Sequence, residues 1–244
     1  MTIKQRIRAF QRRLRQALSG TSFASPKAAH YDHLWSETVT LIPVRSDPAN
    51  RQRNLELAVA ALQGLHVGPG QVFSFWKSVP APTLANGFLP GPAFSRGKVI
   101  QDVGGGLCLV STNLYNTFLQ AGLEILERHN HSIDPYGEAR FFPLGRDAMV
   151  YYGYKDLAVH NQLAHAFSLR LELDEQRLKS VLWAPEPLLE SPRLESEVVE
   201  QWPAPGPEGM PGYRTRTRCW QGGRQTYQDF SQYAACECGY RHWL

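Results

Sequence analysis

The sequence has few cysteines and no long apolar run. Four cysteines in a chain of 244 residues are too sparse for a disulfide framework, so reduced thiols are the default expectation. No stretch approaches the ~20 apolar residues of a membrane-spanning helix. The basic N-terminus also lacks the apolar centre of a secretory signal. These absences favour a soluble, cytoplasmic protein.

Acidic residues are missing from the N-terminal arm, residues 1–26. Seven Lys and Arg residues precede Asp32, the first acid, whereas the whole chain has a formal net charge of +4. The remainder is therefore net negative, which argues against a body that binds polyanions. Within residues 3–18, apolar side chains recur at helical spacing among Arg, Lys and Gln, namely Ile3, Ile7, Phe10, Leu14 and Leu18. This pattern predicts a basic amphipathic helix that ends near Gly20.

Three partners suit such a helix, and the sequence leaves the choice open. The apolar stripe could pack on the domain while the arginines stay in water. It could instead lie on an anionic membrane surface through residues 3–18, which would make the protein peripheral to the inner face of the membrane. Nucleic acid is the least favoured partner.

The rest of the chain predicts one mixed α+β domain at residues 27–185, with a central, mostly antiparallel sheet packed on a cysteine-bearing helix. Helices are expected at 54–65, with Asn54 as N-cap, and from 107 to about 121. Strands are expected at 37–44, 67–79, 124–133, 147–154, 167–173 and 177–183. The Pro- and Gly-rich segment 80–97 is predicted to be a functional loop. Residues 186–244 are interpreted as a linker, rich in Pro and Glu, and a C-terminal extension.

The strongest chemical signal is Cys108, which follows three glycines at the predicted start of a helix. A helix N-terminus carries partial positive charge and unpaired N–H groups, which favour a thiolate. Glycines allow close approach of a substrate or another backbone, and the N–H groups near Gly106 could stabilise an oxyanion. The candidate substrate-binding residues are Gly104, Gly105, Gly106, Ser111, Thr112 and Arg146.

Two histidines and an aspartate downstream complete a candidate catalytic set. His129 and His131 are two apart in a predicted strand, so they should share a face, and Asp147 opens the next strand. In such a set His131, or alternatively His129, would take the proton of Cys108, and Asp147 would orient the imidazole. The helix–strand–strand order is similar to that of transglutaminase-like and papain-like cysteine enzymes, a likeness of fold alone.

Each of these residues also has a structural interpretation. Cys108 could be a small core residue, the histidines could be surface residues, and Asp147 could form a turn or pair with Arg146. His129, His131 and Asp147 could instead bind a metal ion. A weaker zinc candidate consists of Cys219, Cys236, Cys238 and His242. The glycines do not form a phosphate loop, and we expect no cofactor.

Five segments of the chain resemble the VanW family in collinear order: residues 69–75, 104–116, 127–132, 145–148 and 153–157. The resemblance covers about residues 50–185, and its most specific part is the Gly-Gly-Gly-Leu-Cys run that ends at Cys108. One departure is Leu109, which stands where the family usually has glutamine. The family is associated with glycopeptide (vancomycin) resistance, so the resemblance implies a cell-envelope context.

These observations lead to three hypotheses about function. The first is a Cys-His-Asp acyl transferase or amidohydrolase that acts on a peptide-like or peptidoglycan-precursor substrate. The second is a non-catalytic module that binds a cell-wall fragment or partner protein through the loop 80–97 and nearby aromatic residues. The third is a metal-dependent protein that uses His129, His131 and Asp147.

Overall fold

The computed structural model describes the chain except for residues 27–29, 44–47, 96–97, 135, 138–139 and 238–244. Helices and mostly antiparallel sheets are interleaved along the sequence, which confirms the α+β prediction. The larger sheet has the order β1-β3-β9-β10-β2. Its strands are β1 (Ser25–Pro26), β2 (His33–Leu41), β3 (Leu65–Val67), β9 (Phe167–Leu173) and β10 (Arg177–Ala184). The β9–β10 hairpin turns at Asp174, and its strands match those predicted at 167–173 and 177–183.

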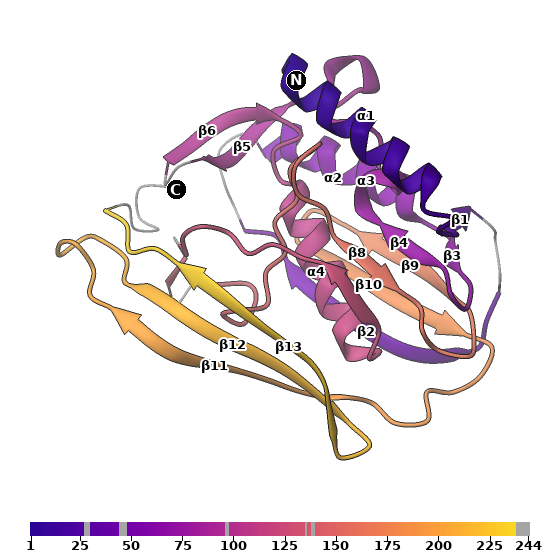
Figure 1. Cartoon of the computed structure of the whole chain (residues 1–244). Coiled ribbons are helices and arrows are strands. Elements are labelled where there is room, and N and C mark those ends of the chain that lie inside the picture. Colours follow the sequence, from indigo (N-terminus) through magenta and orange to yellow (C-terminus); the bar gives the residue numbers. More distant parts are fainter. Residues whose placement is uncertain (27–29, 44–47, 96–97, 135, 138–139, 238–244) are drawn as a thin grey trace.

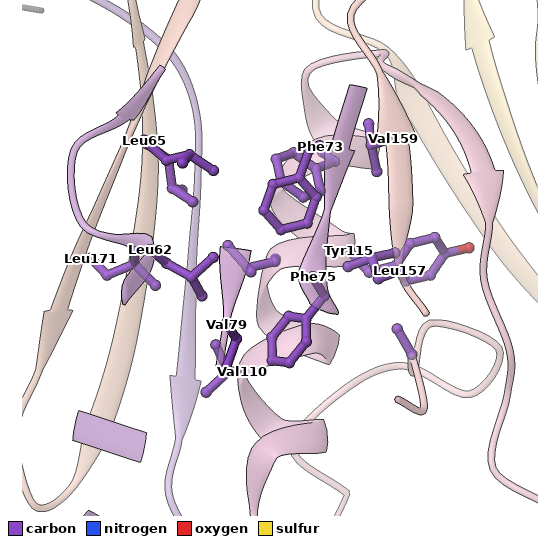
Figure 2. Close-up of a cluster of buried hydrophobic side chains, with 14 of the residues drawn as sticks. Leu62, Leu65, Phe73, Phe75, Val79, Val110, Tyr115, Leu157, Val159 and Leu171 are labelled. Carbon is purple, nitrogen blue, oxygen red and sulfur yellow. The ribbon is translucent and has the colours of Figure 1, made fainter. Parts of the chain in front are cut away.

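Helix α4 (Leu107–Gln120) lies at the centre of the fold, between the larger sheet and a second sheet of order β4-β8-β7 (Figure 1). The strands of the second sheet are β4 (Val72–Ser74), β7 (Glu124–Glu127) and β8 (Ala158–His160). Phe118 of α4 packs 5.0 Å from the ring of Phe73 in β4 and 6.1 Å from that of Phe167 in β9. Figure 2 shows this core, where Val110 and Tyr115 of α4 lie among residues from both sheets. The apolar side chains of α4 that face the two sheets are buried, among them Leu107, Leu114 and Phe118.

Helix α2 (Pro48–Leu62) begins six residues before the predicted start, with proline at its first position, where the missing N–H costs nothing. Asn54 is therefore not a cap. Its buried side chain donates to the backbone carbonyls of Leu89 and Gly105 and accepts from the N–H of Leu89. The interior asparagine thus fastens the glycine run before α4 to the neighbouring hairpin.

That hairpin, formed by β5 (Pro90–Ser95) and β6 (Lys98–Val103), occupies much of the segment predicted to be a loop. Before it come α3 (Phe75–Ser78) and a single 3-10 turn, η1 (Leu84–Asn86). Two other strand predictions were too long. Strand β7 ends at Glu127, and residues 147–154 form only an isolated bridge between Tyr151 and Lys155.

A third antiparallel sheet follows the larger sheet in sequence, and α4 lies between these two sheets (Figure 1). It consists of β11 (Arg193–Trp202), β12 (Gly212–Gln221) and β13 (Arg224–Tyr233). Strand β11 falls inside the segment interpreted as a linker. Its glutamates pair across the strands with arginines of β12, in the pairs Glu195–Arg218, Glu197–Arg216 and Glu200–Arg214.

Helix α1 (Ile3–Leu18) packs across the domain by one face (Figure 1). The predicted apolar stripe is not that face, because its five side chains are 49–78% exposed. The interpretation in which the stripe packs on the domain is therefore wrong. Among the residues described, no helix is both long enough and apolar enough to cross a bilayer.

Candidate active site

The three glycines before α4 are each required by backbone geometry. Gly104 and Gly106 have φ angles of 89° and 100°, which L side chains rarely adopt. A Cβ atom on Gly105 would lie 2.2 Å from the backbone carbon of Gly91 in β5, so a side chain cannot be accommodated. The glycine run therefore lets the β5–β6 hairpin press directly against the start of α4, which is the close backbone approach expected from the sequence.

The first turn of α4 keeps unpaired N–H donors. Gly106 is the N-cap residue and provides no side-chain cap. Within the described part of the chain, neither the N–H of Gly106 nor that of Cys108 has a hydrogen-bond acceptor. Unpaired donors at a helix N-terminus, where the helix dipole is positive, favour negative charge. The arrangement suits an oxyanion formed beside Cys108.

The thiol of Cys108 is half-buried and reaches a cavity of about 330 Å³. Its Sγ lies 3.6 Å from the carbonyl oxygen of Val150. His131 lines the same cavity, and its interaction with Cys108 is one of the causes that raise its pKa. Helix α4 thus delivers the thiol, and an irregular segment between β7 and β8 delivers the imidazole.

Asp147 fixes the orientation of His131. Its Oδ2 lies 2.5 Å from Nδ1 of the ring and accepts the backbone N–H of His131 at 2.6 Å. Because Nδ1 faces the carboxylate, Nε2 is the ring nitrogen left to exchange a proton with Cys108. The predicted Cys-His-Asp residues Cys108, His131 and Asp147 are therefore brought together.

The protonation of this set follows from its contacts. Burial lowers the pKa of His131, but the hydrogen bond with Asp147 and the interaction with Cys108 outweigh it and raise the pKa to about 10. Burial raises the pKa of Asp147, yet the positive charge of Arg128 and the bond from His131 hold it well below its usual range. At neutral pH the pair is an imidazolium and a carboxylate. His131 therefore begins as a proton donor, ready to stabilise a thiolate.

Arg128 holds Asp147 from the other side and was missed at the sequence level. Its guanidinium is almost fully buried and lies 5.2 Å from the centre of the Tyr115 ring. All five of its N–H groups donate, over 2.6–3.1 Å, to the backbone and carboxylate of Asp147, the carbonyl of Gly145, Asp229 and Ser231. The available signal was its position inside the motif that contains both histidines.

The third sheet supplies the remaining support. Tyr233 of β13 donates its hydroxyl to Oδ1 of Asp147 at 2.5 Å, and Asp229 and Ser231 of the same strand accept from Arg128. Asp147 thus receives four hydrogen bonds on its two oxygens. Nothing in the sequence pattern linked the C-terminal extension to the motif around Asp147, because the contact is long-range.

The other predicted site residues lie around this set. His129 faces away from it, with Nε2 3.0 Å from Glu127, because the backbone leaves the strand before the two histidines could share a face. Ser111 and Thr112 hydrogen-bond the backbone of Ala148 and so fasten the segment after Asp147 to α4. Arg146 points to Ser196 of β11.

Aromatic side chains form much of the cavity wall, and they too were not predicted individually. They come from several segments: Trp76, Tyr136, Phe141, Phe142, Tyr151 and Tyr152. Lys155, Arg51 and Asp102 add charged groups, and Leu109 also lies in the wall. This lining suits a ligand with both apolar and polar parts.

No group of three or more His, Cys, Asp or Glu side chains in the described residues is placed to hold a metal ion. Cys219 is buried in β12, and burial raises its pKa to about 12. Cys236 is also buried. The other two members of the C-terminal zinc candidate, Cys238 and His242, lie outside the described residues.

A known family matches the part of the chain that contains this site. The family model described as VanW like protein matches residues 50–183, which is more than half of the chain. The chain belongs to the VanW family. The matched VanW region contains Cys108, Arg128, His131 and Asp147, whereas Tyr233 and the rest of the third sheet lie beyond it.

Two relatives are similar to about half of the chain. The chain is 33% identical over 125 residues to the uncharacterized protein YoaR of Bacillus subtilis (strain 168), which covers 51% of this chain and 40% of the relative. It is 31% identical over 136 residues to the vancomycin B-type resistance protein VanW of Enterococcus faecalis (strain ATCC 700802 / V583), which covers 55% of this chain and 50% of the relative. The chain therefore spans half or less of each relative's length. No solved structure matches it significantly.

Proposed function

We propose that this VanW domain is a cysteine-dependent acyl transferase or amidohydrolase with Cys108 as its nucleophile. The observation that carries the proposal is that Asp147 orients His131 in the wall of the same cavity that Cys108 lines, where the imidazole and the thiol interact. An imidazolium paired with a buried carboxylate stabilises a neighbouring thiolate, and the thiolate is the reactive form of cysteine.

The reaction follows from the positions of the donors. The Sγ thiolate attacks the carbonyl carbon of an amide, and the carbonyl electrons move to oxygen, where the N–H groups of Gly106 and Cys108 donate. The C–N bond then breaks and Nε2 of His131 gives its proton to the leaving nitrogen, which leaves a thioester on Cys108. Water or an amine next attacks the thioester carbon and passes a proton to the now neutral His131. The C–S bond then breaks, which releases the acid or new amide and restores the Cys108 thiolate beside the imidazolium.

The proposed substrate is a peptide-like fragment or precursor of the cell wall. The aromatic walls and the charged Lys155 and Asp102 of the cavity suit a ligand of mixed polarity. A relative carries vancomycin resistance in its name, which supports a cell-envelope setting for the family.

A binding module without turnover is the second candidate. The observation in its favour is Leu109, an apolar residue in the cavity wall next to the proposed nucleophile. The two candidates differ in the effect of Cys108→Ser. If the domain only binds its ligand, this substitution leaves ligand binding unchanged. If the domain is an enzyme, the same substitution abolishes turnover.

Alkylation of the native chain tests the thiolate directly. Iodoacetamide is applied across pH, and each modified cysteine is quantified by peptide mass spectrometry. We expect Cys108 to react at least about tenfold faster at pH 6 than a reference thiol, which is almost fully protonated there. His131→Gln should remove most of this advantage.

Two matched measurements make the test decisive. Cys219 is an internal control, because its raised pKa and burial predict slow reaction throughout this pH range. His129→Gln is the control substitution, since His129 contacts Glu127 and not the thiol. Reactivity of Cys108 that follows the reference thiol at every pH, or that is indifferent to His131→Gln, would refute the proposal.

A further inference from the structure

Helix α1 is attached to the domain through its polar face. Arg12 forms a two-pronged ion pair with Glu127, with N–O distances of 2.6 and 3.0 Å. Gly153 permits the close approach of the helix, because a Cβ atom there would lie 2.7 Å from the carbonyl oxygen of Gln5. Gln5 and Ala9 are the buried residues of α1. The contact face of the helix is thus defined by Gln5, Ala9 and Arg12.

The aromatic rim of the domain adds to this attachment. The guanidinium of Arg8 lies 4.7 Å from the centre of the Tyr154 ring, and Arg13 donates to the hydroxyl of Tyr152 at 3.4 Å. The helix also begins with a complete capping box between Thr2 and Gln5. These contacts fix the rotation of α1 about its own axis, and therefore which side chains face outward.

The outward face is apolar with basic edges. At 3.6 residues per turn, the exposed stripe of Ile3, Ile7, Phe10, Leu14 and Leu18 lies opposite the contact face. Lys4 and Arg15 follow one edge of the stripe, and Arg6 and Arg13 follow the other. No acidic residue occurs in the helix.

We propose that α1 is an interfacial helix that docks this chain on the surface of an anionic lipid bilayer. The apolar stripe enters the boundary between headgroups and acyl chains, and the two basic edges contact anionic headgroups. A second copy of the chain is a poorer occupant. Pairing two stripes would bring basic edges together with no acidic side chain of either helix to neutralise them.

Docking would also place the cavity close to the lipid. Met1 and Gln5, at the start of α1, line the same cavity as Cys108 and His131. The bilayer surface would therefore lie within about the width of one helix from the cavity wall. This consequence follows from the position of α1, whether or not Cys108 is a nucleophile.

Vesicle flotation of the full chain tests the proposal. The chain is mixed with vesicles of phosphatidylcholine alone or of phosphatidylcholine with phosphatidylglycerol, and the bound fraction is measured. We expect binding to the phosphatidylglycerol vesicles that weakens as salt is added. The double substitution Ile7→Ser with Phe10→Ser should weaken it by at least about tenfold. Arg6→Gln with Arg15→Gln should weaken it by about fivefold per arginine.

The control is Leu41→Ser, which removes an apolar side chain of β2 that is 68% exposed, close to the 66% of Phe10. It should leave vesicle binding unchanged. All the substituted side chains are exposed, so the melting temperatures should stay within a few degrees of the parent chain. Equal binding by the parent and the Ile7→Ser/Phe10→Ser variant would overturn the proposal. So would a dimer in light scattering that this variant converts to a monomer, because the stripe would then be a protein interface.

Discussion

Two networks of the same composition lie close together in this fold. Each contains an arginine, a carboxylate and a histidine: Arg128–Asp147–His131 in the interior and Arg12–Glu127–His129 at the rim. The side chains of the interior network are 2%, 0% and 19% exposed, in that order. Those of the rim network are 25%, 27% and 37% exposed. Only the interior network adjoins a thiol.

The two networks differ in how far water is excluded from their charged groups. In the interior, each charge depends on its partners, because water is largely excluded, and the pKa of His131 rises to about 10 as a result. At the rim, burial raises the pKa of Glu127, the bonds from Arg12 and His129 lower it, and the net direction is downward. Solvent screens this second network, so its main effect is to attach α1. Burial, and not residue type, separates a candidate catalytic network from a structural one.

The largest predicted effect is that of Arg128→Met. The change leaves the carboxylate of Asp147 buried with one fewer partner and removes the donors to β13. We expect the free energy of unfolding to fall by about 3–5 kcal/mol, as is typical when one partner of a buried ion pair is removed. Urea titration followed by circular dichroism measures it. A loss below about 1 kcal/mol would mean that Arg128 contributes no more than an arginine in a surface ion pair. The interior and rim networks would then not differ in stability.

The pH dependence of stability is the next largest effect. Because the pKa of His131 is raised when folded, its contribution is complete below the unfolded pKa near 6.5 and is lost as pH rises through about 10. The contribution of Asp147 to stability has the opposite pH dependence. Because the pKa of Asp147 is lowered when folded, that contribution is lost only when the pH falls. We therefore expect the urea midpoint to decrease between pH 6.5 and pH 10.

Two histidine variants assign this decrease. His131→Gln should make the midpoint nearly independent of pH over that range. His129→Gln should keep the parent's decrease, because the ring of His129 hydrogen-bonds to Glu127 at the rim of the domain. If both variants behave alike, the alkaline loss of stability has another origin.

The sequence predicted the elements whose cause is local. Helix α4 and the β9–β10 hairpin followed from their periodicity and turn residues, and Cys108, His131 and Asp147 followed from their motifs. Strand β11 was missed because its glutamates resemble a solvated linker until they are paired with Arg214, Arg216 and Arg218, which lie on the next strand. Their partners could not be assigned from spacing alone.

The site was predicted in part for the same reason. Residues 128–133 were expected to continue the strand that begins at residue 124, but Arg128 and His131 instead hydrogen-bond to Asp147 from an irregular backbone. Strand periodicity does not predict the conformation of a segment whose backbone hydrogen-bonds to a buried carboxylate. Tyr233 could not be predicted as a site residue, because only the folded third sheet brings it to Asp147. The long-range polar contacts, more than the core packing, could not be predicted from the sequence.

The smallest predicted effect is that of Arg12→Met, the same substitution in the rim network. Arg12 and Glu127 are each about one quarter exposed, although Arg12 also lies 3.6 Å from the buried carboxylate of Asp156. We therefore expect the free energy of unfolding to fall by about 1 kcal/mol, less than for Arg128→Met. Limited trypsin digestion should nevertheless cleave α1 faster than in the parent chain, because the helix loses its two-pronged contact to the domain. Leu41→Met, an exposed change elsewhere, is the control for general effects of substitution and should leave the digestion unchanged. A loss as large as that of Arg128→Met would mean that the two networks share one environment, and burial would no longer explain why only one of them lies beside Cys108.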